Sequence, residues 1–195
     1  MDERTVLILL GIAGVAATFA GFSGVVAVFG RRAHGEWFLE DRFRLMNMLV
    51  TSLGACLFAF LPTVGVLLHI HGDDLWAISS LLMCVYCVAY IVNLVPNWQH
   101  LLIKHPGVLS VPASVVVFTS SVVAALLQLL NAVSILFHRE PGPYVMGLLL
   151  LLIIAGLQFA LLVLRPLTAH HRTHSDKPAA PEPVASEQDP DAHHP

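Results

Sequence analysis

Charged residues are scarce in this chain of 195 residues, of which Asp, Glu, Lys and Arg make up only 12%. Soluble domains carry about 25% charged residues, so the share here is roughly half the usual one. The formal net charge is −3, and no excess of basic residues favours nucleic acid as a partner. Together with a hydrophobic content of 56%, the shortage of charge indicates a membrane protein.

Asp, Glu, Lys and Arg are missing altogether from five long apolar segments. These segments are 6–30, 45–70, 75–95, 111–137 and 144–164. Each has the ~20 residues that a helix needs to cross the hydrocarbon core. Pro96 and Pro166 are expected to end the third and fifth helices, because proline lacks the N–H of a helical hydrogen bond. The sequence therefore predicts an all-α fold, a polytopic membrane bundle of five transmembrane helices within residues 1–166.

The start of the chain lacks the positive region of a secretory signal, so the first apolar segment is expected to remain as a span. Eight of the ten cations fall on one side of the predicted bundle: Arg31, Arg32, Arg42, Arg44, Lys104, Arg165, Arg172 and Lys177. Because cytoplasmic loops carry the excess of Lys and Arg, the N-terminus is predicted outside and the C-terminus in the cytoplasm. Eight of the ten cations are Arg, which is typical of a GC-rich bacterial genome. The expected location is a cell membrane, the bacterial inner membrane.

Residues 167–195 are rich in Pro, Ala, Asp and Glu and contain no aromatic residue. Such a segment buries too little apolar surface to offset the entropy of ordering, so it is predicted to be a disordered cytoplasmic tail. The role of the histidines in this tail stays open.

Cysteine is rare, with three residues in the chain. Cys84 and Cys87 form a CxxC motif in the third segment, and a hairpin of the second and third segments would bring Cys56 to a similar depth. Clustered thiols can bind a soft metal or act in redox chemistry. An apolar environment disfavours the reactive thiolate, however, and no His, acid or cation lies beside these thiols in the third segment. Small buried hydrophobic side chains are the favoured interpretation, and a thiol cluster is the alternative.

Four large amides lie inside the predicted spans: Asn93, Gln128, Asn131 and Gln158. Such groups form hydrogen bonds between helices or line a path for a polar solute. The lack of intramembrane charge disfavours a proton relay or an ion pathway. A polar network that joins helices is favoured, and a neutral-solute carrier or channel is the alternative.

The sequence HIHGDD at 69–74 concentrates imidazole and carboxylate groups between the second and third spans. Together with residues of the other outer loop it suggests one candidate zinc site, formed by His69, His71, His138 and Glu140. The local alternative is a hairpin turn. Histidines in the last helical turn meet unpaired carbonyl groups, Gly72 suits the left-handed position after a helix, and Asp73 or Asp74 can cap the next helix. The turn is the favoured interpretation.

The loop 31–44 mixes aromatic side chains with arginine and is the candidate interfacial or partner-docking loop. Its candidate residues are Arg31, Arg32, Trp37, Arg42 and Arg44. In the first span, small residues recur every four positions at Ala13, Ala17 and Gly21, with Ala20 and Gly24 on a neighbouring line. This pattern is expected to pack inside the bundle, with a homo-oligomer seam as the alternative.

These features favour a small membrane scaffold or accessory subunit that acts through helix packing and the basic aromatic loop. Its expected partners are the lipid bilayer and a second copy or another membrane protein. The alternatives are a neutral-solute transporter or channel and a membrane thiol-redox protein. No span carries a His and a carboxylate on one face, so hydrolytic catalysis is not expected, and no cofactor is indicated.

Overall fold

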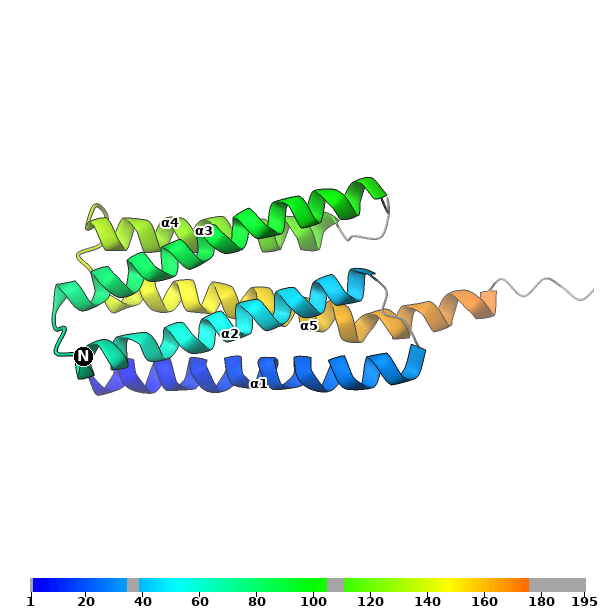
Figure 1. Ribbon diagram of the computed structural model, residues 1–195, viewed down its shortest axis with the longest axis horizontal. Helices are drawn as coiled ribbons and strands as arrows, with labels where there is room; N and C mark the ends of the chain where they lie inside the picture. Colours follow the sequence, from blue (N-terminus) through cyan, green and yellow to red (C-terminus); the bar gives the residue numbers. More distant parts are fainter. Residues whose placement is uncertain (1, 35–38, 105–110, 176–195) are drawn as a thin grey trace, which may run out of the picture. The chain divides into compact units, whose positions relative to one another are not determined.

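The structure is a computed structural model, and it describes residues 2–34, 39–104 and 111–175. These residues form five helices: α1 (Glu3–His34), α2 (Leu39–Leu67), α3 (Asp73–Lys104), α4 (Val111–Val133) and α5 (Pro141–Ser175) (Figure 1). No strand occurs in this part of the chain. All five helices contain a stretch that is long and apolar enough to cross a membrane. The predicted all-α bundle of five membrane-spanning helices is confirmed.

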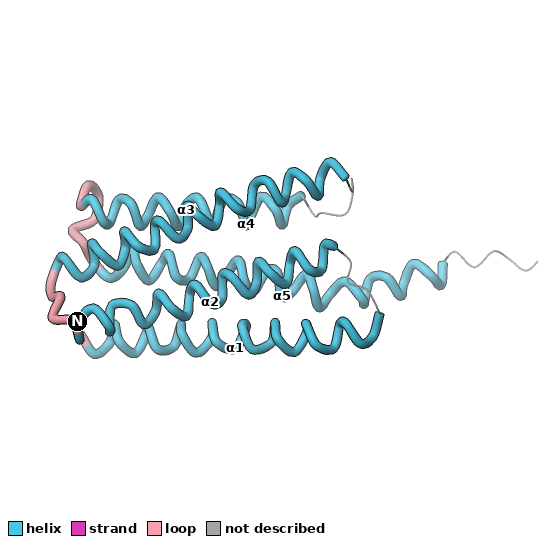
Figure 2. The backbone as a smooth tube through the Cα atoms, viewed as in Figure 1, coloured by secondary structure: helices cyan, strands magenta, loops and turns pink. Residues whose placement is uncertain are grey.

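The chain divides into two compact units, 1–162 and 163–195. Within the first unit successive helices run in opposite directions (Figure 1). The connections from α2 to α3 and from α4 to α5 lie at the same end of this unit (Figure 2). Asp74, in the first turn of α3, and Arg139, in the second connection, form an ion pair with 3.6 Å between oxygen and nitrogen. By the predicted orientation, this is the extracytoplasmic end.

Two helices continue through prolines that were expected to end them. Pro96 lies inside α3, which extends to Lys104, and Pro166 lies within the bounds of α5. The prediction was wrong at both positions because an interior proline removes one hydrogen bond, a loss that membrane helices tolerate. Residues 167–175 of the predicted tail accordingly belong to α5, and 176–195 lie outside the described residues.

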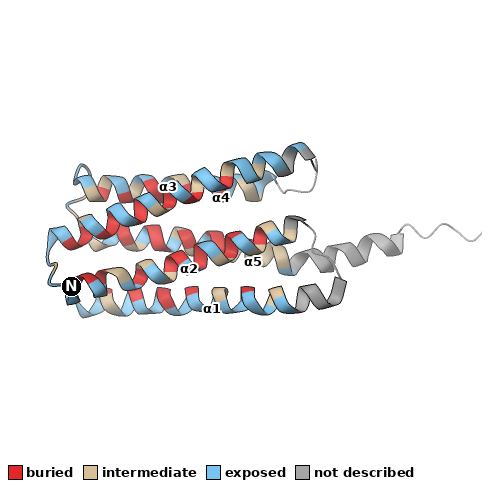
Figure 3. Cartoon of the chain, viewed as in Figure 1, coloured by how far each residue is buried: buried red, intermediate tan, exposed pale blue. Residues whose placement is uncertain are grey.

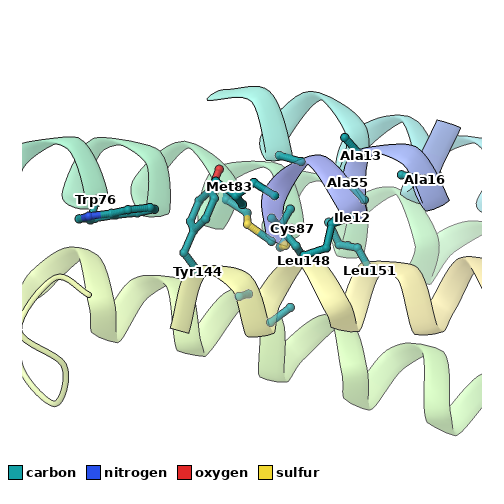
Figure 4. Packing of buried hydrophobic residues seen from close by; sticks show 14 residues of the cluster. Ile12, Ala13, Ala16, Ala55, Trp76, Met83, Cys87, Tyr144, Leu148 and Leu151 are labelled. Carbon is teal, nitrogen blue, oxygen red and sulfur yellow. The ribbon is translucent and has the colours of Figure 1, made fainter. Parts of the chain in front are cut away.

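The core of the first unit forms where side chains of α1, α2, α3 and α4 meet α5. Tyr144, Leu148 and Leu151 of α5 are buried there, with Ala16 of α1 and Met83 of α3 (Figure 4). On each helix the buried residues follow one side, and the exposed residues follow the other (Figure 3). Because lipid tails are as apolar as leucine, close packing and interhelical hydrogen bonds hold such a bundle together, rather than the hydrophobic effect.

The first helix begins immediately after Asp2, whose carboxylate interacts with Thr5. A hydrogen bond from the Thr5 side chain lowers the pKa of Asp2 below its usual value. An acidic side chain at this position pairs with otherwise unsatisfied N–H groups of the first turn, so Asp2 serves as the N-cap of α1.

Candidate functional site

A cavity of about 310 Å³ lies in the first unit, bordered by the first turns of α2, the later turns of α3, the start of α4 and the second half of α5. Its volume is at the lower end of the range of small-molecule pockets, about 300–1,000 Å³. The wall is mainly apolar and includes Leu94 and Val95 of α3, Val117 and Phe118 of α4, and Leu161 of α5. By the predicted orientation, this cavity lies in the cytoplasmic half of the bundle.

Four nitrogen-bearing side chains interrupt this apolar wall: Arg44, Asn47, Trp98 and Gln158. Arg44 is only 6% exposed, and its Nη1 lies 3.5 Å from the carbonyl oxygen of Leu161. Asn47 and Trp98 border the same cavity, and no described residue accepts a hydrogen bond from Asn47 Nδ2 or Trp98 Nε1. A buried donor without an acceptor costs about 1–3 kcal/mol. The polar part of the cavity is therefore suited to a ligand that accepts hydrogen bonds.

Arg44 was predicted to belong to an interfacial loop, and the structure places its side chain between helices instead. Arg42 is exposed, whereas Trp37 and the side chains of Arg31 and Arg32 lie outside the described residues. Arg44 and Asn47 are three residues apart and share one face of a helix, but this spacing does not indicate whether the face points to lipid or between helices.

The four intramembrane amides occupy different surroundings. Asn131 is fully buried, where Nδ2 donates to Ser80 Oγ at 2.8 Å and to the Glu140 carbonyl at 3.1 Å. Its Oδ1 accepts a hydrogen bond from the Glu140 N–H at 3.1 Å. Asn131 thus joins α4 to α3 and to the residue that precedes α5.

Gln128 lies one turn before Asn131, and its Nε2 donates to the Pro143 carbonyl at 2.9 Å. Gln158 is buried and borders the cavity. Asn93 is exposed and bonds to the Ala89 carbonyl of its own helix at 2.7 Å. No contact described for these side chains links all four into one network or along one path.

The HIHGDD segment adopts a helix-ending turn. α2 ends at Leu67, so His69 and His71 lie beyond the helix rather than in its last turn. The Ile70 N–H donates to the Gly65 carbonyl and the His69 N–H to the Val66 carbonyl, each at 3.0 Å. These two bonds define a Schellman motif. The left-handed residue in it is His69, with φ of 64°, and Gly72 follows with φ of 65°.

The candidate metal ligands are not brought together. The described residues contain no group of three or more His, Cys, Asp or Glu side chains placed to hold a metal ion. The candidate ligands His69, His71, His138 and Glu140 form no such group, and neither do the three cysteines. Cys84 and Cys87 are buried, Cys56 is partly buried, and all three are free thiols.

The glycines of α1 differ in their surroundings from three glycines of the other helices, Gly54, Gly65 and Gly147. A Cβ at Gly54 would clash with Tyr86, at Gly65 with Leu75, and at Gly147 with Gln128. At four glycines of α1 it would meet no described atom within 4 Å: Gly11, Gly14, Gly21 and Gly24. Of the predicted small-residue line, Ala13 faces the core, whereas Ala17 and Gly21 are exposed. On the neighbouring line Ala20 is partly buried and Gly24 is exposed, so the expectation of packing inside the bundle holds fully for Ala13 alone.

Comparison with known proteins finds no matching family model, no matching curated protein and no matching solved structure. The five apolar helices fit a multi-pass integral membrane protein.

Proposed function

We propose that the chain is a small membrane scaffold or accessory subunit that packs the outward face of α1 against a transmembrane helix of a partner. The observation that carries this proposal is the position of the α1 glycines. Gly11, Gly14, Gly21 and Gly24 lie on exposed positions where no described side chain needs the space. Glycine disfavours a helix by about 1 kcal/mol relative to alanine. Without a contact inside the chain, exposed glycines that recur along α1 favour a close approach by a helix of another molecule.

The hydrogen bonds of two buried amides support the same proposal. Asn131 and Gln128 bond to the backbone of residues 140 and 143, beside the start of α5. Groups that hold helix ends in this way stabilise a static bundle. The alternative of a neutral-solute carrier is less well supported, because of the four amides only Gln158 borders the cavity.

Leucine substitutions on the two faces of the bundle test the proposal. Gly14→Leu and Gly21→Leu would place bulky side chains on the α1 face, whereas Ala89→Leu enlarges an exposed position of α3. Two differently tagged copies would be co-expressed and purified in mild detergent, and in parallel cross-linked in the membrane to capture other membrane proteins.

The expected result is that Gly14→Leu and Gly21→Leu lose the associated chain, and Ala89→Leu retains it. A second tagged copy in the complex identifies self-association, and a different membrane protein identifies an accessory role. Equal recovery of the associated chain with all three variants, or a monomer in both measurements, would contradict the proposal.

A further inference from the structure

We infer that the cavity between α2, α3, α4 and α5 binds an amphiphile, with an anionic head group at Arg44 and an apolar chain against the walls. This inference is independent of the proposed contact at α1, because no residue of α1 lines the cavity among those that the structure describes.

The head group is indicated by the charge and by the direction of the polar contacts. Arg44 supplies a positive charge at a position that is 6% exposed. Asn47, 8% exposed, and Trp98 supply N–H donors for which no described residue is an acceptor. A carboxylate or phosphate complements this set, because it accepts several hydrogen bonds and carries the opposite charge.

The apolar chain is indicated by the remaining wall. Leu94, Val95, Val117 and Phe118 present hydrocarbon from two helices, a surface that an inorganic anion would leave without contacts. The cavity also lies near the helix ends at which Arg and Trp occur, the level of the lipid head groups in a spanning orientation. A fatty acid and an anionic phospholipid share the required chemistry, and the experiment separates them.

The test measures retention of defined lipids by the purified full-length chain, using native mass spectrometry in mild detergent. The probes are oleate, dioleoylphosphatidylglycerol and dioleoylphosphatidylcholine, each titrated separately. We expect one equivalent of an anionic probe to be retained, and the zwitterionic phosphatidylcholine to bind about 10- to 100-fold more weakly. Preference for oleate identifies a fatty-acid site, and preference for phosphatidylglycerol identifies a phospholipid site.

Two arginines of α2 provide a matched pair of variants. Arg44→Gln is expected to weaken retention of the anionic probe by about 10- to 100-fold, since a hydrogen bond to a charged group is lost. Arg42→Gln removes the same charge at an exposed position two residues away and should retain the probe as the unmodified chain does.

A third variant leaves Arg44 in place and fills the cavity with a larger side chain. Ala113 borders the cavity, so Ala113→Phe is expected to abolish retention through the volume that it occupies. If Arg44→Gln does not fold, Ala113→Phe still tests whether the cavity holds the probe. The inference is overturned if neither anionic probe is retained, if phosphatidylcholine is retained equally, if Arg44→Gln and Arg42→Gln behave alike, or if Ala113→Phe retains the probe.

Discussion

The hydroxyl of Tyr144 donates a 2.6 Å hydrogen bond to the carbonyl oxygen of Phe58. In a regular α-helix that carbonyl accepts from the N–H of residue 62, but residue 62 is a proline inside α2 and has no N–H. Pro62 is buried, and no water reaches a bundle core within the hydrocarbon region. Tyr144 of α5 therefore supplies the donor that Pro62 removes from α2.

Tyr144→Phe is expected to lower the free energy of unfolding by about 1–3 kcal/mol, because the Phe58 carbonyl is then buried without a donor. The ring would keep its packing against Trp76, whose centroid lies 5.8 Å away. The measurement is denaturant-induced unfolding in mixed micelles.

Pro62→Ala provides the second arm of a double-mutant cycle. Alanine restores the N–H of residue 62, so Tyr144→Phe should cost much less in that background. Tyr86→Phe is the control, because the Val50 carbonyl that Tyr86 bonds at 2.6 Å has a helical donor at Gly54. Additive effects of Tyr144→Phe and Pro62→Ala would refute the relationship between the two residues.

Asn131→Leu is expected to destabilise the bundle by about 1–3 kcal/mol, because the substitution leaves the Glu140 N–H and carbonyl without their partner. Asn93→Leu removes an exposed amide that bonds only to its own helix and should change stability by less than about 0.5 kcal/mol. Unfolding free energies measured under the same conditions compare the two, and equal effects would argue against the role assigned to Asn131.

Gly54→Ala is expected to destabilise the bundle by about 1–3 kcal/mol, because the added methyl group meets the ring and hydroxyl of Tyr86. Gly142→Ala serves as the control, since its added carbon meets no described atom within 4 Å. Adding Tyr86→Ala to Gly54→Ala should relieve the clash, so a double variant with fully additive losses would contradict the explanation.

His69 provides a test of the turn against the zinc interpretation of the HIHGDD segment. A left-handed conformation costs a non-glycine residue about 1–2 kcal/mol, so His69→Gly should stabilise the fold slightly and His69→Val should destabilise it. Thermal unfolding measures both variants. Calorimetric zinc titration of His69→Gly should match that of the unmodified chain, and a clear loss of affinity would favour the metal site instead.

Sequence reasoning was most successful for properties that depend on each segment alone. The five spans follow from runs of residues without charge, since each helix satisfies its own backbone in lipid whatever its neighbours are. The helix ends were less predictable. Pro96 and Pro166 lie inside helices, because the loss of one hydrogen bond does not outweigh the gain from continuing the helix.

The candidate cavity could not be predicted from the sequence for a related reason. Arg44 lies among loop arginines and is followed by an apolar run, a pattern that an interfacial side chain shares with a buried one. Whether its guanidinium points to head groups or between helices depends on Leu161, which is far away in the chain. The direction of a side chain depends on neighbours that only folding brings together.

The sequence by itself determined that the chain has five helices long and apolar enough to cross a membrane, because charge and length decide the cost of burying a segment in hydrocarbon. The tertiary structure decided which polar groups come together: Tyr144 with the carbonyl freed by Pro62, Asn131 with Glu140, and Arg44, Asn47 and Trp98 around one cavity. Directional hydrogen bonds depend on distances and angles between helices. These distances and angles cannot be derived from the spacing of residues along one helix.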